Sequence, residues 1–139
     1  MHTICIDFGT SSIRAALRKD RNLLPHPLAI APKSPIDNAS IPSAIFISKA
    51  GDDLLFGDRA MEAGLSGQPR RLFESSPKSW LSPANIAHIG TPAATGLPFT
   101  RRQLITGLLS LAVRDSRRAA KHAFELESDT LSYRVSHPV

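Results

Sequence analysis

The sequence predicts a mixed α/β fold on three observations. Residues Thr3–Arg18 alternate apolar and polar side chains in two runs that meet at a glycine and hydroxyl turn, which is typical of paired strands. A second apolar run, with turn residues inside it, covers Ile41–Phe56. After Thr100 apolar residues recur at helical spacing, and Thr130–Val139 returns to strand-like alternation. Strands and a long helix are therefore expected in one chain.

The first segment predicts a β-hairpin. Its two strands flank the turn Gly9–Ser12, and in each strand every second residue is apolar. Such alternation buries one face of a hairpin and leaves the other polar. The apolar positions are Ile4, Ile6 and Phe8 in the first strand, and Ile13, Ala15 and Leu17 in the second.

The turn of this hairpin has residues that suit phosphate binding. Gly9 lets the backbone pass close to a bound group, and the N–H groups and hydroxyls of Thr10, Ser11 and Ser12 would line an anion-binding concavity. Asp7 would repel a phosphate unless a divalent cation lay between them, and magnesium accepts carboxylate, water and phosphate oxygens together. The residues therefore predict a nucleotide phosphate with magnesium. The same residue types also form surface hairpins that bind nothing.

Composition narrows the class of protein. At 139 residues the chain has the size of one ordinary domain, with 42% hydrophobic and 21% charged residues. No apolar run approaches the roughly 18 residues of a membrane span, and the N-terminus shows no secretory signal pattern. The single cysteine, Cys5, fits a small apolar strand residue in a reducing compartment. We expect a cytoplasmic protein without a membrane partner.

The next segments predict a connection and then a strand. Asp20–Ser40 is broken by four prolines, which exclude a helix and leave only short extended pieces such as Leu28–Ala31. We expect this stretch to be connection rather than core. Ile41–Ser48 is an apolar strand whose Pro42 stands near its start, where a missing N–H does least harm.

A short hairpin and a helix follow. Gly51–Asp53 supplies the turn, and Leu54–Phe56 forms the second strand. Asp58 is predicted to be the N-cap of a helix that runs through Leu65 and stops at Gly67.

The last third of the chain predicts a loop, a long helix and a strand. Ser82–Phe99 is a loop by composition, and Thr100 with Gln103 has the spacing of a capping box. The strand expected over Thr130–Val139 is newly begun or lies at a sheet edge. The apolar stripe of the helix comprises Leu104, Leu108, Leu111 and Ala112, continued by Ala119 and Ala123.

Two runs of residues resemble a known family. The sequence Asp7–Ser11 resembles the first phosphate loop of the superfamily that includes actin, sugar kinases and the seventy-kilodalton DnaK-type chaperones. A second run resembles the chaperone branch in order and spacing, and sugar kinases do not share it. That run consists of Ile41-Pro42-Ser43, Phe56-Gly57-Asp58, Ala60, Pro69, Phe73 and Lys78-Ser79-Trp80-Leu81.

The resemblance implies an actin-like ATPase fold of the ribonuclease H-like type. It implies a main lobe of residues 1–40 and 100–139, with a mixed sheet and flanking helices, and a smaller lobe of residues 41–99. Ser136–Val139 is similar to a strand that runs into a Val-Pro pair, so we expect the chain to be incomplete at its C-terminus.

The resemblance also implies roles for single residues. Asp7 would organise magnesium through bound water, and Gly9, Thr10, Ser11 and Ser12 would contact the terminal phosphates of ATP or ADP. Ser12 departs from the larger side chain common at that place in the chaperones. The second implied catalytic residue, a lysine that reaches the transferred phosphate and the attacking water, corresponds to Lys78. Ser76 and Pro77 resemble a small insertion before it.

The function expected from these residues is that of a DnaK-type, ATP-binding and ATP-hydrolysing protein. Client polypeptides or co-chaperones would be partners of the full-length protein. Because the second half of the site would lie downstream, we expect this chain alone to bind nucleotide weakly or not at all and to show no measurable ATPase activity. A sugar kinase fragment is an alternative.

A third reading is a basic interaction module without catalysis. The formal net charge is +5, and a basic stripe lies on one face of the long helix. Aromatic content of only 6% provides no stacking platform for single strands, so we do not expect nucleic acid as a partner. The stripe comprises Arg114, Arg117, Arg118 and Lys121.

The remaining residues with ligand chemistry are expected to be structural. Trp80 is expected to be a packed aromatic. No two histidines share a helix face, and one cysteine makes no zinc pattern. The histidines are His2, His26, His88, His122 and His137.

Overall fold

The chain has a mixed α/β structure, as the sequence predicts, and its described residues form two β-sheets. The computed structural model describes residues 2–19, 24–35, 37–126 and 131–136. Contacts within the chain divide it into two units, one formed by residues 1–41 with 111–139 and the other by residues 42–110. Each unit has one of the two sheets as its framework.

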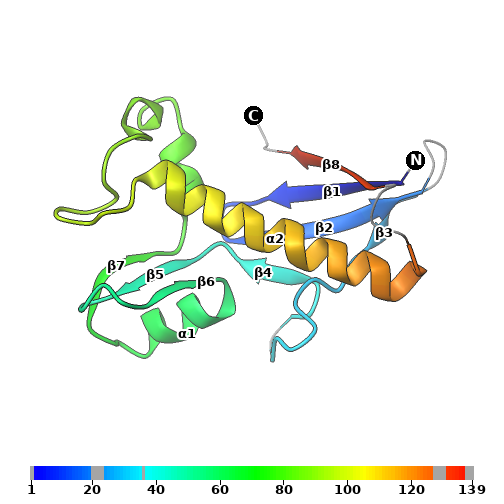
Figure 1. The fold of residues 1–139 in the computed structure, drawn as a ribbon, viewed down its shortest axis with the longest axis horizontal. Helices are drawn as coiled ribbons and strands as arrows, with labels where there is room; N and C mark the ends of the chain where they lie inside the picture. Colours follow the sequence, from blue (N-terminus) through cyan, green and yellow to red (C-terminus); the bar gives the residue numbers. More distant parts are fainter. Residues whose placement is uncertain (1, 20–23, 36, 127–130, 137–139) are drawn as a thin grey trace. The chain divides into compact units, whose positions relative to one another are not determined.

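The sheet of the first unit combines antiparallel and parallel pairing. Strand β1 (His2–Phe8) pairs antiparallel with β2 (Ser12–Arg18), which confirms the predicted hairpin. Beyond β2 lies β3 (His26–Pro27), and β4 (Ser40–Pro42) also pairs with β2. On the other side of β1, strand β8 (Leu131–Ser136) runs parallel to it, so the path is β3-β2-β1-β8 (Figure 1).

The hairpin buries one of its faces completely. The register places the apolar residues of β1 directly opposite those of β2, so all of them point to the same side. Their side chains are at most 7% exposed, whereas the opposite face, which includes Asp7 and Arg14, is partly open. The facing pairs on the buried side are Ile4 with Leu17, Ile6 with Ala15, and Phe8 with Ile13.

The long helix α2 (Arg101–Phe124) begins at the predicted capping box. The N–H of Thr100 donates to Gln103 Oε1 at 2.9 Å, and the N–H of Gln103 donates to Thr100 Oγ1 at 3.1 Å. Two backbone donors that the first helical turn leaves without intrahelical partners are thereby satisfied. The capping-box prediction is confirmed.

The part of α2 that belongs to the first unit runs along the sheet (Figure 1). Its buried positions are Ala112, Ser116 and Ala120, all at 0% exposure. The predicted continuation through Ala123 is wrong, because that residue is exposed and the stripe shifts by one position. The last helical residue, Phe124, packs its ring against His26 at 5.4 Å between centroids.

The segment before β4 contributes to the core, contrary to our expectation of a mere connection. Leu28 and Ile30 are 2% and 1% exposed, and the Leu28 N–H donates to the Ala15 carbonyl oxygen at 2.9 Å. The prolines exclude a helix here, but they do not prevent alternate residues of an extended chain from pointing inward.

The second unit is a three-stranded antiparallel sheet with a helix against it (Figure 1). The strand order is β6-β5-β7, formed by Leu54–Phe56, Ile45–Ser48 and Arg70–Glu74. Helix α1 (Asp58–Leu65) contacts all three strands. Two short 3-10 helices follow in the loop before α2: η1 (Pro77–Leu81) and η2 (Ile86–His88).

Two sequence predictions for this region are wrong. The single strand expected over Ile41–Ser48 is two strands in different sheets, because the Ala44 N–H turns back to the Pro42 carbonyl at 2.8 Å and interrupts the ladder. Asp58 is the first helical residue and not the N-cap; that position is Gly57. With φ of 67°, Gly57 adopts a left-handed conformation that favours glycine over a side-chain cap. Asp58 still complements the helix dipole in the first turn.

A small apolar core holds the second unit together. Phe46, which is 1% exposed on β5, packs with Ala44 and with Ala60 and Ala63 of α1. Phe73 on β7 lies 6.5 Å from Phe46 between ring centroids. One large buried ring therefore joins the sheet to the helix.

We predict that Phe46→Ala lowers the free energy of unfolding by about 3–5 kcal/mol, because it removes a buried ring and leaves a cavity. Urea unfolding monitored by circular dichroism measures this change. The matched control is Leu65→Ala on α1, where the side chain is 76% exposed and the expected change is close to zero. Equal losses for the two variants would contradict the packing described here.

Candidate phosphate-binding site

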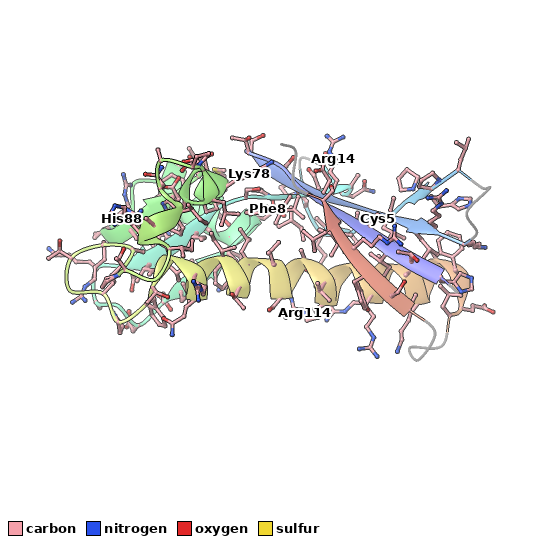
Figure 2. The ribbon with its side chains drawn as sticks, turned by 90° about the horizontal axis from the view of Figure 1, so that it is seen from above. Cys5, Phe8, Arg14, Lys78, His88 and Arg114 are labelled. Carbon is pink, nitrogen blue, oxygen red and sulfur yellow. The ribbon has the colours of Figure 1, made fainter. Side chains whose placement is uncertain are left out.

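The candidate site lies where β1 and β8 end. Because these strands are parallel, their carboxyl ends meet at the same edge of the sheet, next to the turn Gly9–Ser11. Asp7 is exposed there and has Arg14 of β2 on one side and Ser136 of β8 on the other. Arg14 is labelled in Figure 2. In open α/β sheets, ligands bind outside the carboxyl ends of parallel strands.

Ser136 is a site residue that the sequence did not reveal. Its hydroxyl is within hydrogen-bonding distance of Asp7 Oδ1 and of the Ile6 carbonyl oxygen, at 3.4 Å in each case. Both distances are long, so each hydrogen bond is weak. Only the parallel register brings Ser136 beside Asp7, and no sequence motif signals that register.

Arg14 of β2 forms an ion pair with Asp37. Its guanidinium lies 3.9 Å from Asp37 Oδ2, and among the described residues Asp7 forms no ion pair. Asp37 also accepts hydrogen bonds from the Ala39 N–H and the Ser40 hydroxyl, and these, in that order, lower its pKa, with a smaller effect from Arg14. The Asp7 carboxylate is therefore open to solvent at the carboxyl end of β1.

Gly9 has a structural role in this turn. Its N–H donates to the Ser12 carbonyl oxygen at 2.9 Å, and a Cβ at this position would stand 2.5 Å from the same oxygen. From the sequence, we expected this glycine to allow close approach of a ligand. The structure adds a reason that needs no ligand, because any side chain here would collide with the hairpin backbone.

The hydroxyls of the turn have no partner among the described residues. Thr10 and Ser11 are exposed and Ser12 is half-buried. Within the described part of the chain, none of their hydroxyls forms a hydrogen bond. Ordinary turn chemistry would direct such groups to nearby backbone atoms. Within the described ranges these three hydroxyl donors are open to solvent or a ligand, and they follow directly after the strand that carries Asp7.

Lys78, the second implied catalytic residue, belongs to the other unit. It lies half-buried on η1, which begins with the buried Pro77 and is anchored by Trp80 at 6% exposure (Figure 2). The Arg101 guanidinium carbon stands 5.7 Å from the centre of the Trp80 ring. The expectation that Trp80 is a packed aromatic is confirmed, whereas a shared role of Lys78 and Asp7 on one phosphate stays a prediction.

The basic stripe of α2 is exposed along its length, as its helical spacing predicts. Asp115 partly neutralises it, with its Oδ1 3.1 Å from Arg114 Nε and 3.9 Å from Arg118 Nη1. Arg117 and Lys121 are the members without an ion pair in the described residues. Binding of a polyanion to this stripe stays a prediction.

Metal-binding side chains of the described residues are spread over the structure. In the residues that the structure describes, no three His, Cys, Asp or Glu side chains are grouped to hold a metal ion. Magnesium at a nucleotide does not require such a group, because one or two carboxylates, water and substrate phosphates suffice. His137 lies outside the described residues.

Comparisons with known proteins give no assignment. The chain matches none of the protein-family models, and a search of curated proteins also found no match. No helix in the described part of the chain combines the length and the apolar composition that crossing a bilayer requires.

We predict that Gly9→Ala lowers the free energy of unfolding by about 1–3 kcal/mol, because the new methyl group overlaps the Ser12 carbonyl oxygen. Thermal or urea unfolding measures the loss. Gly90→Ala is the matched control, since a Cβ there meets nothing within 4 Å, and its stability should stay unchanged or rise slightly. A Gly9→Ala protein as stable as wild type would contradict the turn geometry.

Proposed function

We propose that this chain binds the phosphates of a nucleotide together with magnesium, as part of an actin-like ATPase of the DnaK type. The observation that carries the proposal is the position of Asp7. An exposed carboxylate without an ion pair in the described residues stands at the carboxyl end of a parallel strand pair, beside a turn with unused hydroxyls. A magnesium ion with its water shell would bridge that carboxylate to phosphate oxygens.

The turn would hold the phosphates and the carboxylate would hold the ion. The hydroxyls of Thr10, Ser11 and Ser12 would donate hydrogen bonds to phosphate oxygens. Asp7 would act on magnesium through water, and Ser136 would help to fix the carboxylate by donating to Oδ1. The structural role of Gly9 fits this arrangement, because the tight turn follows directly after β1, the strand that carries Asp7.

Hydrolysis in such a site would be the attack of a positioned water on the terminal phosphate. Catalysis of this kind depends on orientation and on cations that stabilise the charge developing on the phosphate oxygens. Lys78 is the cation that we propose for this role. The residues assigned here contact only phosphates and magnesium, so we expect weak binding and no measurable turnover from this chain alone.

We prefer a DnaK-type protein over a sugar kinase because the second run of residues, from Ile41 to Leu81, resembles the chaperone branch. In the structure this run includes the sheet β6-β5-β7, helix α1 and η1. Client polypeptides, co-chaperones and a cytoplasmic location belong to the same proposal.

We predict that magnesium-ATP shifts the backbone amide NMR signals of Gly9, Thr10, Ser11 and Ser12 at millimolar concentrations, and that inorganic triphosphate shifts them in the same way. Asp7→Asn should weaken the magnesium-dependent binding by about 10- to 100-fold, because it removes the charge that holds the hydrated ion. Chelation of magnesium should have the same effect on wild type.

The matched control for this titration is Asp53→Asn, which changes the same charge on an exposed turn of the second unit. It should bind as wild type does. An absence of shifts up to about 10 mM nucleotide would overturn the proposal. It would mean that the binding free energy is weaker than about −3 kcal/mol. Shifts that do not depend on magnesium or on Asp7 would overturn it as well.

A further inference from the structure

The second unit contains an open apolar pocket that the proposed phosphate site does not use. Its volume is about 240 Å³, and its wall is formed by η1, η2 and the first two turns of α2. The lining residues are Leu81, Ile86, Ile89, Arg102, Ile105 and Thr106.

Two exposed apolar side chains stand together at this pocket. Leu81 is 37% exposed and Ile86 is 45% exposed, and both line it. Single exposed apolar residues are ordinary on protein surfaces, but adjacent ones around a concavity indicate a place that a partner covers. Burial of such side chains on binding is favourable in proportion to the apolar area removed from water.

Hydrogen bonds hold the pocket wall in place. The Arg102 N–H donates to the Ile89 carbonyl oxygen at 2.8 Å, which ties the end of η2 to the first turn of α2. The Asn85 side-chain amide donates to the Ser79 carbonyl oxygen at 3.0 Å and to Ser82 Oγ at 3.1 Å, which joins η2 to η1. The concavity is therefore preformed, so binding of a ligand does not carry the entropy cost of ordering the pocket wall.

The size of the pocket indicates what kind of group enters it. Pockets for whole small-molecule ligands and cofactors are typically about 300–1,000 Å³, whereas an engineered cavity of about 150 Å³ already binds benzene. At about 240 Å³, this pocket accommodates one large aliphatic or aromatic side chain rather than a complete cofactor. A side chain of that kind is the usual anchor of a peptide in an apolar groove.

The charge at the pocket indicates what stands next to that anchor. Arg102 is exposed, and its guanidinium forms no ion pair in the described ranges of the chain. Thr106, one helical turn further on, is also exposed and adds a hydroxyl on the same side of α2. An acidic side chain beside the anchor would pair with Arg102, whose planar guanidinium suits a carboxylate.

We propose that this pocket binds a peptide segment of another protein in which a large apolar side chain stands next to an acidic residue. The apolar side chain enters between Ile86 and Ile105, and the carboxylate pairs with Arg102. This interaction surface lies within the second unit and does not depend on the phosphate site.

The test is a methyl NMR titration of the full chain with the peptide acetyl-Gly-Glu-Leu-Phe-Glu-Gly-amide. Binding should shift the methyl signals of Leu81, Ile86, Ile89 and Ile105 and leave those of Ile4 and Ile6 unchanged. A matched peptide with glutamine in place of both glutamates should bind about 10-fold more weakly, because it lacks the partner of Arg102. A peptide with serine in place of the two apolar residues should not bind.

Two variants and two controls locate the binding. Arg102→Glu should weaken binding of the acidic peptide at least 10-fold, whereas Arg117→Glu, the same charge change elsewhere on α2, should leave it within about twofold. Ile86→Ser should weaken it, whereas Leu65→Ser, at another exposed apolar residue, should not. All four positions are exposed, so the variants should keep the urea midpoint of the wild type.

Several results would overturn the proposal. Methyl signals of the pocket that stay in place at saturating peptide would exclude the surface, and equal affinity for the glutamine peptide would exclude the acidic requirement. Equal effects of Arg102→Glu and Arg117→Glu would show that only net charge matters. Pocket signals that shift with protein concentration alone would identify a second copy of the chain as the occupant.

Discussion

The first unit depends on the pairing of β1 with β8, which joins two segments that are far apart in the sequence. Six residues of each strand lie in parallel register, and α2 precedes β8 on the way back to the sheet. Closing so long a loop costs conformational entropy, although this cost rises only slowly with loop length. The buried face of the hairpin, with Ile4 and Ile6 at 0% exposure, supplies the apolar burial that offsets it. The same register brings Ser136 to Asp7, so the candidate site depends on the interaction that closes the sheet.

The features that the sequence predicted correctly are those whose physical cause is local. The hairpin over Thr3–Arg18 follows from alternation on both sides of a glycine turn, and its burial pattern agrees residue by residue. The start of α2 follows from two side chains three residues apart, Thr100 and Gln103, which satisfy each other's backbone N–H groups. Nothing distant is needed to decide either feature.

The features that the sequence did not predict require knowledge of a distant partner. Strand β7 (Arg70–Glu74) is short and charged, and it becomes a strand because β5 offers it a partner. The inward turn of Leu28 and Ile30 likewise depends on the sheet they cover. In the candidate site, Asp7 and the hydroxyls of the turn were visible as a motif, whereas Ser136 and the pairing of Arg14 with Asp37 follow only from the fold. The sequence therefore predicted the residues of the motif, but not the residues that the fold brings next to them.

Strand β8 forms the edge of the described sheet and exposes 37% of Tyr133 and 46% of Val135 on the side that in β1 is fully buried. An edge strand offers unpaired backbone donors and acceptors to any extended chain that reaches it. The β-branched and aromatic side chains that share one face of β8 favour such an association. Arg134, between them, points to the opposite face and places a charge on the same strand. Self-association through an added strand would therefore bury apolar surface along β8, and the charge of Arg134 opposes it.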